Sequence, residues 1–96
     1  MYARVTSIRF PPWMRAEVVG VAQGLAPLLS QQRGFNGLQV LTDSSVGEGL
    51  IVSLWETEAD VEASETNSSY IGQMSMMSSF LYGRLERKTY EVNVRV

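Results

Sequence analysis

The stretch GFNGLQVLTDSSVGEGLIVSLWETEAD, from Gly34 to Asp60, predicts the centre of the fold. Residues 38–42 and 50–55 are rich in the β-branched and large apolar side chains that suit strands. The segment DSSVGEG between them combines Asp and Ser, which bond their own backbone, with Gly, which supplies positive φ. Two strands separated by so short a loop predict an antiparallel hairpin.

Both ends of this stretch carry signals for its neighbours. Gly34 and Gly37 bracket Phe35-Asn36, which predicts a sharp turn after a preceding helix. At the other end, Thr57 can cap a following helix, because Asp60 stands three residues on as a short variant of the capping box.

The segment before the hairpin predicts a strand and then a helix. Residues 2–10 alternate loosely and indicate a first strand, which Pro11-Pro12 ends because proline cannot donate to a ladder. From residue 14 to residue 33 the apolar positions mark one face of a helix; they are Met14, Val18, Val21, Ala22, Leu25 and Leu29. Pro27 inside this segment predicts a kink or a break.

The segment after the hairpin predicts two helical pieces and a last strand. Residues 57–65 form a short acidic helix, which Asn67-Ser68-Ser69 can interrupt or recap. Apolar residues at positions 70, 74, 77 and 81 follow at helical spacing until Gly83. Residues 85–96 end in a strict alternation of apolar and polar side chains, the pattern of a strand. The order βαββαβ predicts an α+β, ferredoxin-like protomer whose antiparallel sheet carries helices on one face.

Composition excludes several functional classes. The 96 residues form one domain, 1–96, and the net charge of −2 argues against nucleic-acid binding. With no cysteine and no histidine, thiolate chemistry and the commonest metal ligand are absent, so no metal site is expected. No apolar run approaches the ~18 residues of a membrane span, and a cytoplasmic location is expected. The first three strands are apolar on both sides, which predicts a homodimer formed through the second face of the sheet.

Four segments together resemble the antibiotic biosynthesis monooxygenase domain family. They are MYARVT at the start, RGFNGLQVL before the hairpin loop, SLWETEAD after it, and ERKTYEV near the end. The resemblance implies a dimeric α/β barrel, in which two ferredoxin-like protomers pack sheet against sheet. It covers nearly the whole chain, and its most specific pieces are the GF-x-G turn and the LWE that closes the third strand.

The resemblance also implies a choice of chemistry. Some relatives oxidise aromatic polyketides with molecular oxygen and no cofactor, whereas others degrade haem with a histidine that this chain lacks. We therefore expect a cofactor-independent monooxygenase acting on an aromatic or polyketide-like small molecule. Two alternatives stay open: a non-catalytic module that binds a small apolar ligand, and an isomerase or cyclase, which an acid–base pair facing the cavity would favour.

Six residues are candidates for substrate binding: Arg4, Trp55, Tyr70, Met74, Met77 and Arg87. Each also has a structural interpretation, because a tryptophan and methionines at helical spacing are usual in a core, and arginines on neighbouring strands often pair with glutamates. The acidic run from Glu56 to Glu65 is interpreted as a solvated helix face rather than a metal cluster.

Overall fold

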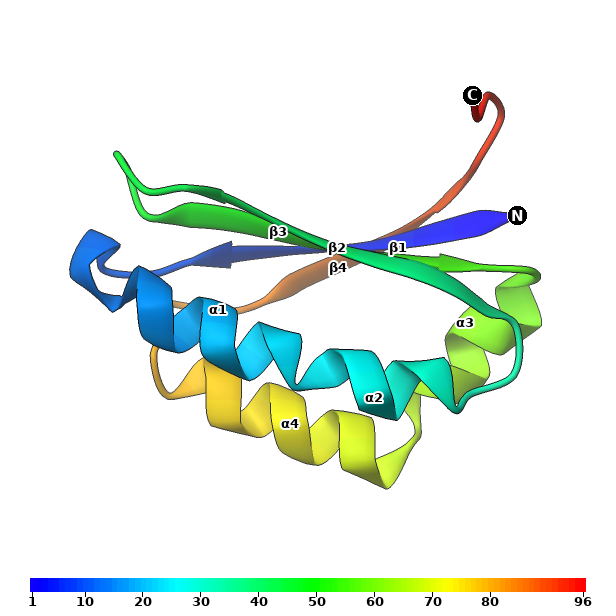
Figure 1. Cartoon of the computed structure of the whole chain (residues 1–96), viewed down its shortest axis with the longest axis horizontal. Helices are drawn as coiled ribbons and strands as arrows, with labels where there is room; N and C mark the ends of the chain where they lie inside the picture. The colour runs from blue at the N-terminus through cyan, green and yellow to red at the C-terminus, as the bar shows by residue number, and fades with distance from the viewer.

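The computed structural model describes residues 1–96. It contains one four-stranded antiparallel sheet with the strand order β2-β3-β1-β4. Its strands are β1 (Tyr2–Arg9), β2 (Phe35–Asp43), β3 (Glu48–Trp55) and β4 (Glu86–Glu91). The helices are α1 (Arg15–Gln23), which follows a 3-10 turn η1 (Pro12–Met14), then α2 (Leu25–Ser30), α3 (Glu58–Glu65) and α4 (Ser68–Ser78). All of them lie on one face of the sheet (Figure 1). The α+β ferredoxin-like order predicted from the sequence is confirmed.

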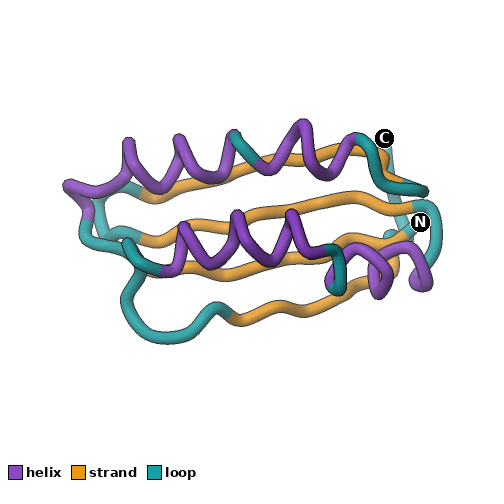
Figure 2. The backbone as a smooth tube through the Cα atoms, turned by 90° about the horizontal axis from the view of Figure 1, so that it is seen from below, coloured by secondary structure: helices purple, strands orange, loops and turns teal.

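The helices form a layer across the lower face of the sheet. Seen from that side, α1 and α2 run in line along one edge, α4 runs beside them, and α3 lies past one end of α4 (Figure 2). The core lies between the two layers; its buried apolar residues are Ile8, Phe10, Val18, Ala22, Leu25, Leu29, Ile51, Trp55, Val61, Tyr70, Met74 and Met77. The opposite face of the sheet is open.

The hairpin predicted at the centre of the sequence is present, and its first strand is longer than expected. β2 begins at Phe35 rather than at Leu38, so the predicted turn after the helix is present but does not include Phe35-Asn36. The chain turns earlier, at Gly34, where φ is +80°. A register shift between Phe35 and Gly37 then takes up the extra residue as a bulge, which lets the strand start early without losing its pairing to β3.

The break in the first helical segment falls at Gly24, between α1 and α2, and not at Pro27. Pro27 lies in the first turn of α2, where a missing N–H leaves no intrahelical bond unmade. The same segment ends at Ser30, earlier than the expected Arg33. Gly24 therefore marks the junction of the two helices, and Pro27 lies where α2 tolerates it.

Caps on α3 and α4 follow the sequence prediction. The Thr57 hydroxyl accepts a hydrogen bond of 3.1 Å from the Asp60 N–H. The Asn67 side chain accepts one of 3.0 Å from the Tyr70 N–H, so Asn67 restarts the helix after α3. This second cap fixes where Tyr70 begins its turn of α4, and with it which side of the helix faces the sheet.

The last strand ends at Glu91, and the expectation of a strand continuing to Val96 is wrong. β1 begins at Tyr2, whose partner is Glu91, so the sheet offers no neighbour beyond this point. The Val92 N–H bonds the Met1 carbonyl at 2.9 Å, and the remaining residues leave the sheet toward its open side (Figure 1). An alternating sequence therefore forms a strand only as far as a neighbouring strand is present to pair with it.

No helix is both long and apolar enough to cross a membrane.

The hairpin loop gives a test of the backbone constraint at Gly47. Its φ is +70°, and an added Cβ would run into the Phe10 carbonyl oxygen. Gly83 has a similar φ of +64° and open space around it. We expect Gly83→Ala to cost about 1 kcal/mol of unfolding free energy, and Gly47→Ala about 3 kcal/mol, measured by urea unfolding. Equal costs would show that the Phe10 contact adds nothing.

Candidate functional site

Two hollows open on opposite sides of the sheet. The smaller, of about 310 Å³, lies on the helix side and is lined by Glu65, Tyr70, Ile71, Met74, Ser75, Ser78, Leu85 and Arg87. The larger, of about 490 Å³, lies on the open face near the β2–β3 loop. Both volumes fall in the range of roughly 300–1,000 Å³ that ligand pockets occupy. The residues that line the two hollows differ, and this difference indicates which hollow is the better candidate for a ligand site.

The helix-side hollow brings together three of the six residues predicted from the sequence: Tyr70, Met74 and Arg87. Tyr70 and Met74 are one turn apart on α4, and Arg87 comes from β4. Tyr70 is 2% exposed, and its hydroxyl has no hydrogen-bond partner in the protein. Among side-chain polar atoms that are shielded from solvent, only Nε2 of Gln32 lacks a partner, so the Tyr70 hydroxyl is not among the shielded atoms. The Tyr70 hydroxyl is therefore open to the hollow.

Arg4 lies behind the wall of this hollow rather than in its lining. It occupies a core-facing position of β1, is 2% exposed, and donates a hydrogen bond to the Ser64 hydroxyl. Its Cζ lies 4.5 Å from the centre of the Tyr70 ring and 5.5 Å from that of Trp55. Aromatic faces attract a cation at such distances, so the two rings hold the guanidinium in place of a close carboxylate.

The charge of Arg4 is weakly compensated for a buried group. Glu65 is its only ion-pair partner, and the distance from Arg4 Nη1 to Glu65 Oε1 is 4.0 Å. Burial lowers the pKa of Arg4 from its ordinary value, and the neighbouring Tyr70 and Glu65 oppose this shift whereas Arg87 adds to it. An arginine starts so far above neutrality that the guanidinium stays charged. The wall of the hollow thus carries a fixed positive charge.

The other two predicted residues do not reach the hollow. Trp55 is fully buried, donates a 2.8 Å hydrogen bond to the Ser53 hydroxyl, and packs edge-on against Phe35 with ring centres 5.5 Å apart. Met77 is fully buried in the core. Both therefore occupy the positions that the structural interpretation gave them.

The sequence interpretation missed Glu65. It was grouped with the solvated acidic face, but its side chain is only 34% exposed and lines the hollow together with Arg87. The signal available was its place as the last residue of α3, next to Ser64, which turns inward to meet Arg4. No group of three or more acidic side chains is arranged to hold a metal ion.

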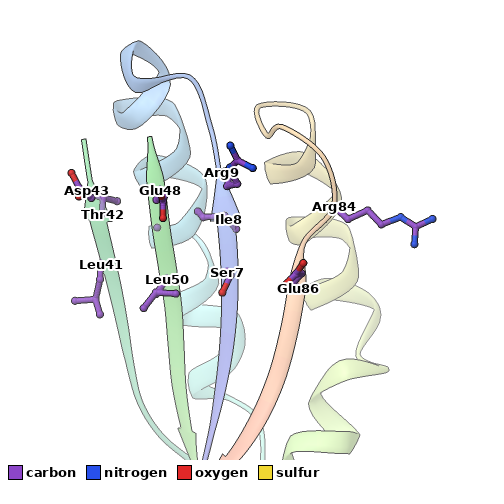
Figure 3. Close-up of a pocket in the computed structure, with 11 residues that line it drawn as sticks. Ser7, Ile8, Arg9, Leu41, Thr42, Asp43, Glu48, Leu50, Arg84 and Glu86 are labelled. Carbon is purple, nitrogen blue, oxygen red and sulfur yellow. The ribbon is translucent and has the colours of Figure 1, made fainter. Parts of the chain in front are cut away.

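The larger hollow has a mixed lining on the open face (Figure 3). Apolar Leu41 and Leu50 lie on neighbouring strands beside Ser7, and Glu86 lies at the same level (Figure 3). Arg9, Asp43 and Glu48 lie nearer the loop end, and Arg84 extends away from the sheet (Figure 3). One of these charges, Asp43, already accepts hydrogen bonds from the Ser45 hydroxyl and N–H, which lower the pKa of its carboxyl. None of the six predicted residues lines this hollow.

Residues 1–71 match the antibiotic biosynthesis monooxygenase family. The chain belongs to this family. The resemblance found in the sequence is therefore confirmed, and the match spans β1 to the first turn of α4. No curated protein matches the chain in sequence.

Solved structures of this fold are similar over nearly the whole chain. A mutant form of SnoaB, a cofactor-independent oxygenase from Streptomyces nogalater, superposes with a TM-score of 0.83 at 12% identity, covering 99% of this chain and 95% of that one. Rv0793 from Mycobacterium tuberculosis gives 0.81 at 8% identity, with coverages of 98% and 96%. A conserved protein from Methanosarcina mazei gives 0.80 at 14% identity, with coverages of 94% and 91%. At such identities the likeness shows the fold.

The environment of Arg4 yields a stability test. Ser64→Ala leaves the buried guanidinium without its hydrogen bond, and bonds to charged groups contribute about 1.5–3 kcal/mol. We expect Ser64→Ala to lower the free energy of unfolding by about 2 kcal/mol. Adding Arg4→Met should restore most of it, because an apolar side chain of similar volume removes the buried charge. Urea unfolding of both proteins measures this, and a double variant less stable than Ser64→Ala would contradict it.

Proposed function

We propose that this chain is a cofactor-independent monooxygenase acting on a hydroxylated aromatic or polyketide-like small molecule in the helix-side hollow. The observation that carries the proposal is the lining itself. An apolar wall made by Ile71, Met74 and Leu85 stands beside the Tyr70 hydroxyl and the Arg87 guanidinium. An apolar space with a few convergent donors is the usual form of a small-molecule site.

The chemistry asks little of the protein. An electron-rich phenolate or enolate can pass an electron to molecular oxygen, after which the two radicals combine; one oxygen atom stays on the substrate carbon and the other leaves as water with two substrate hydrogens. The protein has to exclude water and stabilise the substrate anion. Arg87 and Tyr70 are the hydrogen-bond donors for that anion, and the positive charge of Arg4 behind the wall attracts it as well. Family membership and the likeness to SnoaB support the same reaction class.

The proposal is tested by oxygen uptake. Chelator-treated protein is incubated with anthrone-like phenols without flavin, haem or metal, and uptake above the protein-free control is expected. Arg87→Gln and Tyr70→Phe should each reduce kcat/KM by about tenfold or more, as the loss of an anion donor does. Arg15→Gln is the matched control, because it removes the same charge from an exposed position of α1 and lines neither hollow. Activity that returns only with flavin or iron overturns the proposal.

An isomerase or cyclase is the second candidate. Glu65 and Tyr70 line the same hollow, so a carboxylate and a phenol are placed to act as an acid–base pair on one ligand. Conversion of a phenol or enol without oxygen uptake would favour this candidate. Ligand binding without either conversion would favour the non-catalytic module.

We also propose that the working form is a homodimer joined through the open face of the sheet. Leu41, Leu50 and Tyr90 are 49%, 38% and 47% exposed there, and Val5 and Val52 lie half-buried between them. Exposed apolar side chains on adjacent strands form a patch of the kind that interfaces use. A second copy presents the same patch to itself, which is what a two-fold interface requires.

The dimer is tested by light scattering at low micromolar concentration. We expect the mass of two chains, and an interface above the roughly 1,000 Å² of specific contacts. Leu50→Asp, which places a charge in the patch, should give a folded monomer, whereas Glu62→Gln on the helix side should leave the mass unchanged. A monomer mass for the unaltered protein would remove the idea.

A further inference from the structure

Glu65 is the only acidic residue of α3 that lines the helix-side hollow; Asp60 is also half-buried but lies outside that lining. Glu58 and Glu62, also on α3, are exposed to solvent, whereas the Glu65 side chain is 34% exposed and lines the helix-side hollow. It is the only carboxylate in that lining. Its position at the end of α3 brings it between β1 and α4, where Arg4 and Tyr70 lie.

The Glu65 carboxylate accepts no hydrogen bond within the protein. Arg4 Nη1 lies 4.0 Å from Oε1, which is beyond hydrogen-bond distance, because that N–H group is donated to the neighbouring Ser64 hydroxyl instead. No other group of the protein donates to the Glu65 side chain. The cation therefore attracts the carboxylate without occupying its lone pairs.

The groups that face Glu65 come from three elements. Arg4 approaches from β1, Tyr70 from α4, and Arg87 lines the hollow from β4. Two are cations and the third is a phenol, so no second carboxylate competes with Glu65 for a proton. A ligand anion formed in the hollow would meet the same cations.

We propose that Glu65 is the general base of the helix-side hollow and takes the proton from an acidic hydroxyl of an aromatic ligand. The inference rests on the proposed function and adds to it the class of substrate, a phenol or enol that binds in its neutral form. The ligand O–H bond breaks, its electron pair stays on the ligand oxygen, and a new O–H bond forms on the carboxylate. The negative charge moves from Glu65 to the ligand, and nothing is oxidised until molecular oxygen reacts afterwards.

The test compares Glu65→Gln with Glu62→Gln, which removes the same charge from the exposed side of the same helix. The first measurement is kcat/KM for oxygen uptake across pH. Positioned bases contribute about 10²–10⁴-fold, so we expect Glu65→Gln to lose about 100-fold at neutral pH. The loss should shrink as the pH rises and the phenol ionises in solution, and Glu62→Gln should follow the unaltered protein.

The second measurement does not depend on turnover. A hydroxylated anthraquinone is bound to each protein near neutral pH, and its absorbance distinguishes the phenolate from the neutral phenol. We expect more of the phenolate form with Glu65→Gln than with the unaltered protein and with Glu62→Gln, because Glu65→Gln keeps the cations of Arg4 and Arg87 and loses the carboxylate that repels the ligand anion. Circular dichroism on each variant confirms that the fold is kept.

The outcomes separate the two proposals. Oxygen uptake that Glu65→Gln does not change overturns the role of Glu65 and leaves the monooxygenase proposal standing. Ionisation of the bound anthraquinone that depends on Glu65, without any oxygen uptake, supports the base and overturns the monooxygenase. Failure of the anthraquinone to bind any of the proteins overturns the assignment of the hollow, and the base with it.

Discussion

Arg4 places a charge where the pleat of the sheet directs a core side chain, and the surroundings of the helix-side hollow are built around it. Alternate residues of β1 point into the helix layer, so Arg4, Thr6 and Ile8 share one side. A buried cation needs compensation. Tyr70 and Trp55 provide aromatic faces, Ser64 provides an acceptor, and Glu65 is drawn to within 4.0 Å. These contacts tie β1 and β3 to α3 and α4.

The features of the fold that depend on only a few neighbouring residues could be predicted from the sequence. The caps at Thr57 and Asn67 and the hairpin loop were predictable, since each depends on a side chain and the backbone next to it. The starts and ends of strands were less so. The extra length of β2 depends on a bulge against β3, and the end of β4 depends on where β1 begins. Neither partner is visible in the strand's own sequence.

The site was predictable by residue type and only partly by position. Tyr70, Met74 and Arg87 meet in one hollow because the helix α4 and the edge strand β4 lie on the same side of the molecule (Figure 2). Trp55 and Met77 are an aromatic and a methionine, like Tyr70 and Met74, but neighbouring side chains bury them completely, so they do not line the hollow. The prediction for Glu65 was wrong because the many acidic residues from Glu56 to Glu65 indicated a helix face exposed to solvent along its whole length. Whether the last residue of a helix faces water or the core depends on how the helix lies against the sheet, and sequence spacing does not give that.

The two faces of the sheet present different chemistry, and this bears on how binding and assembly can coexist. The helix-side hollow draws its lining from α4, the end of α3, Leu85 and Arg87, and it shares no lining residue with the hollow on the open face. A second copy packed on the open face would cover Leu41 and Leu50 without touching Tyr70 or Glu65. The link between the faces is β1 itself, where Arg4 and Val5 are adjacent and point to opposite sides. Covering the open face would therefore restrain β1 and, through it, the cation behind the wall of the hollow.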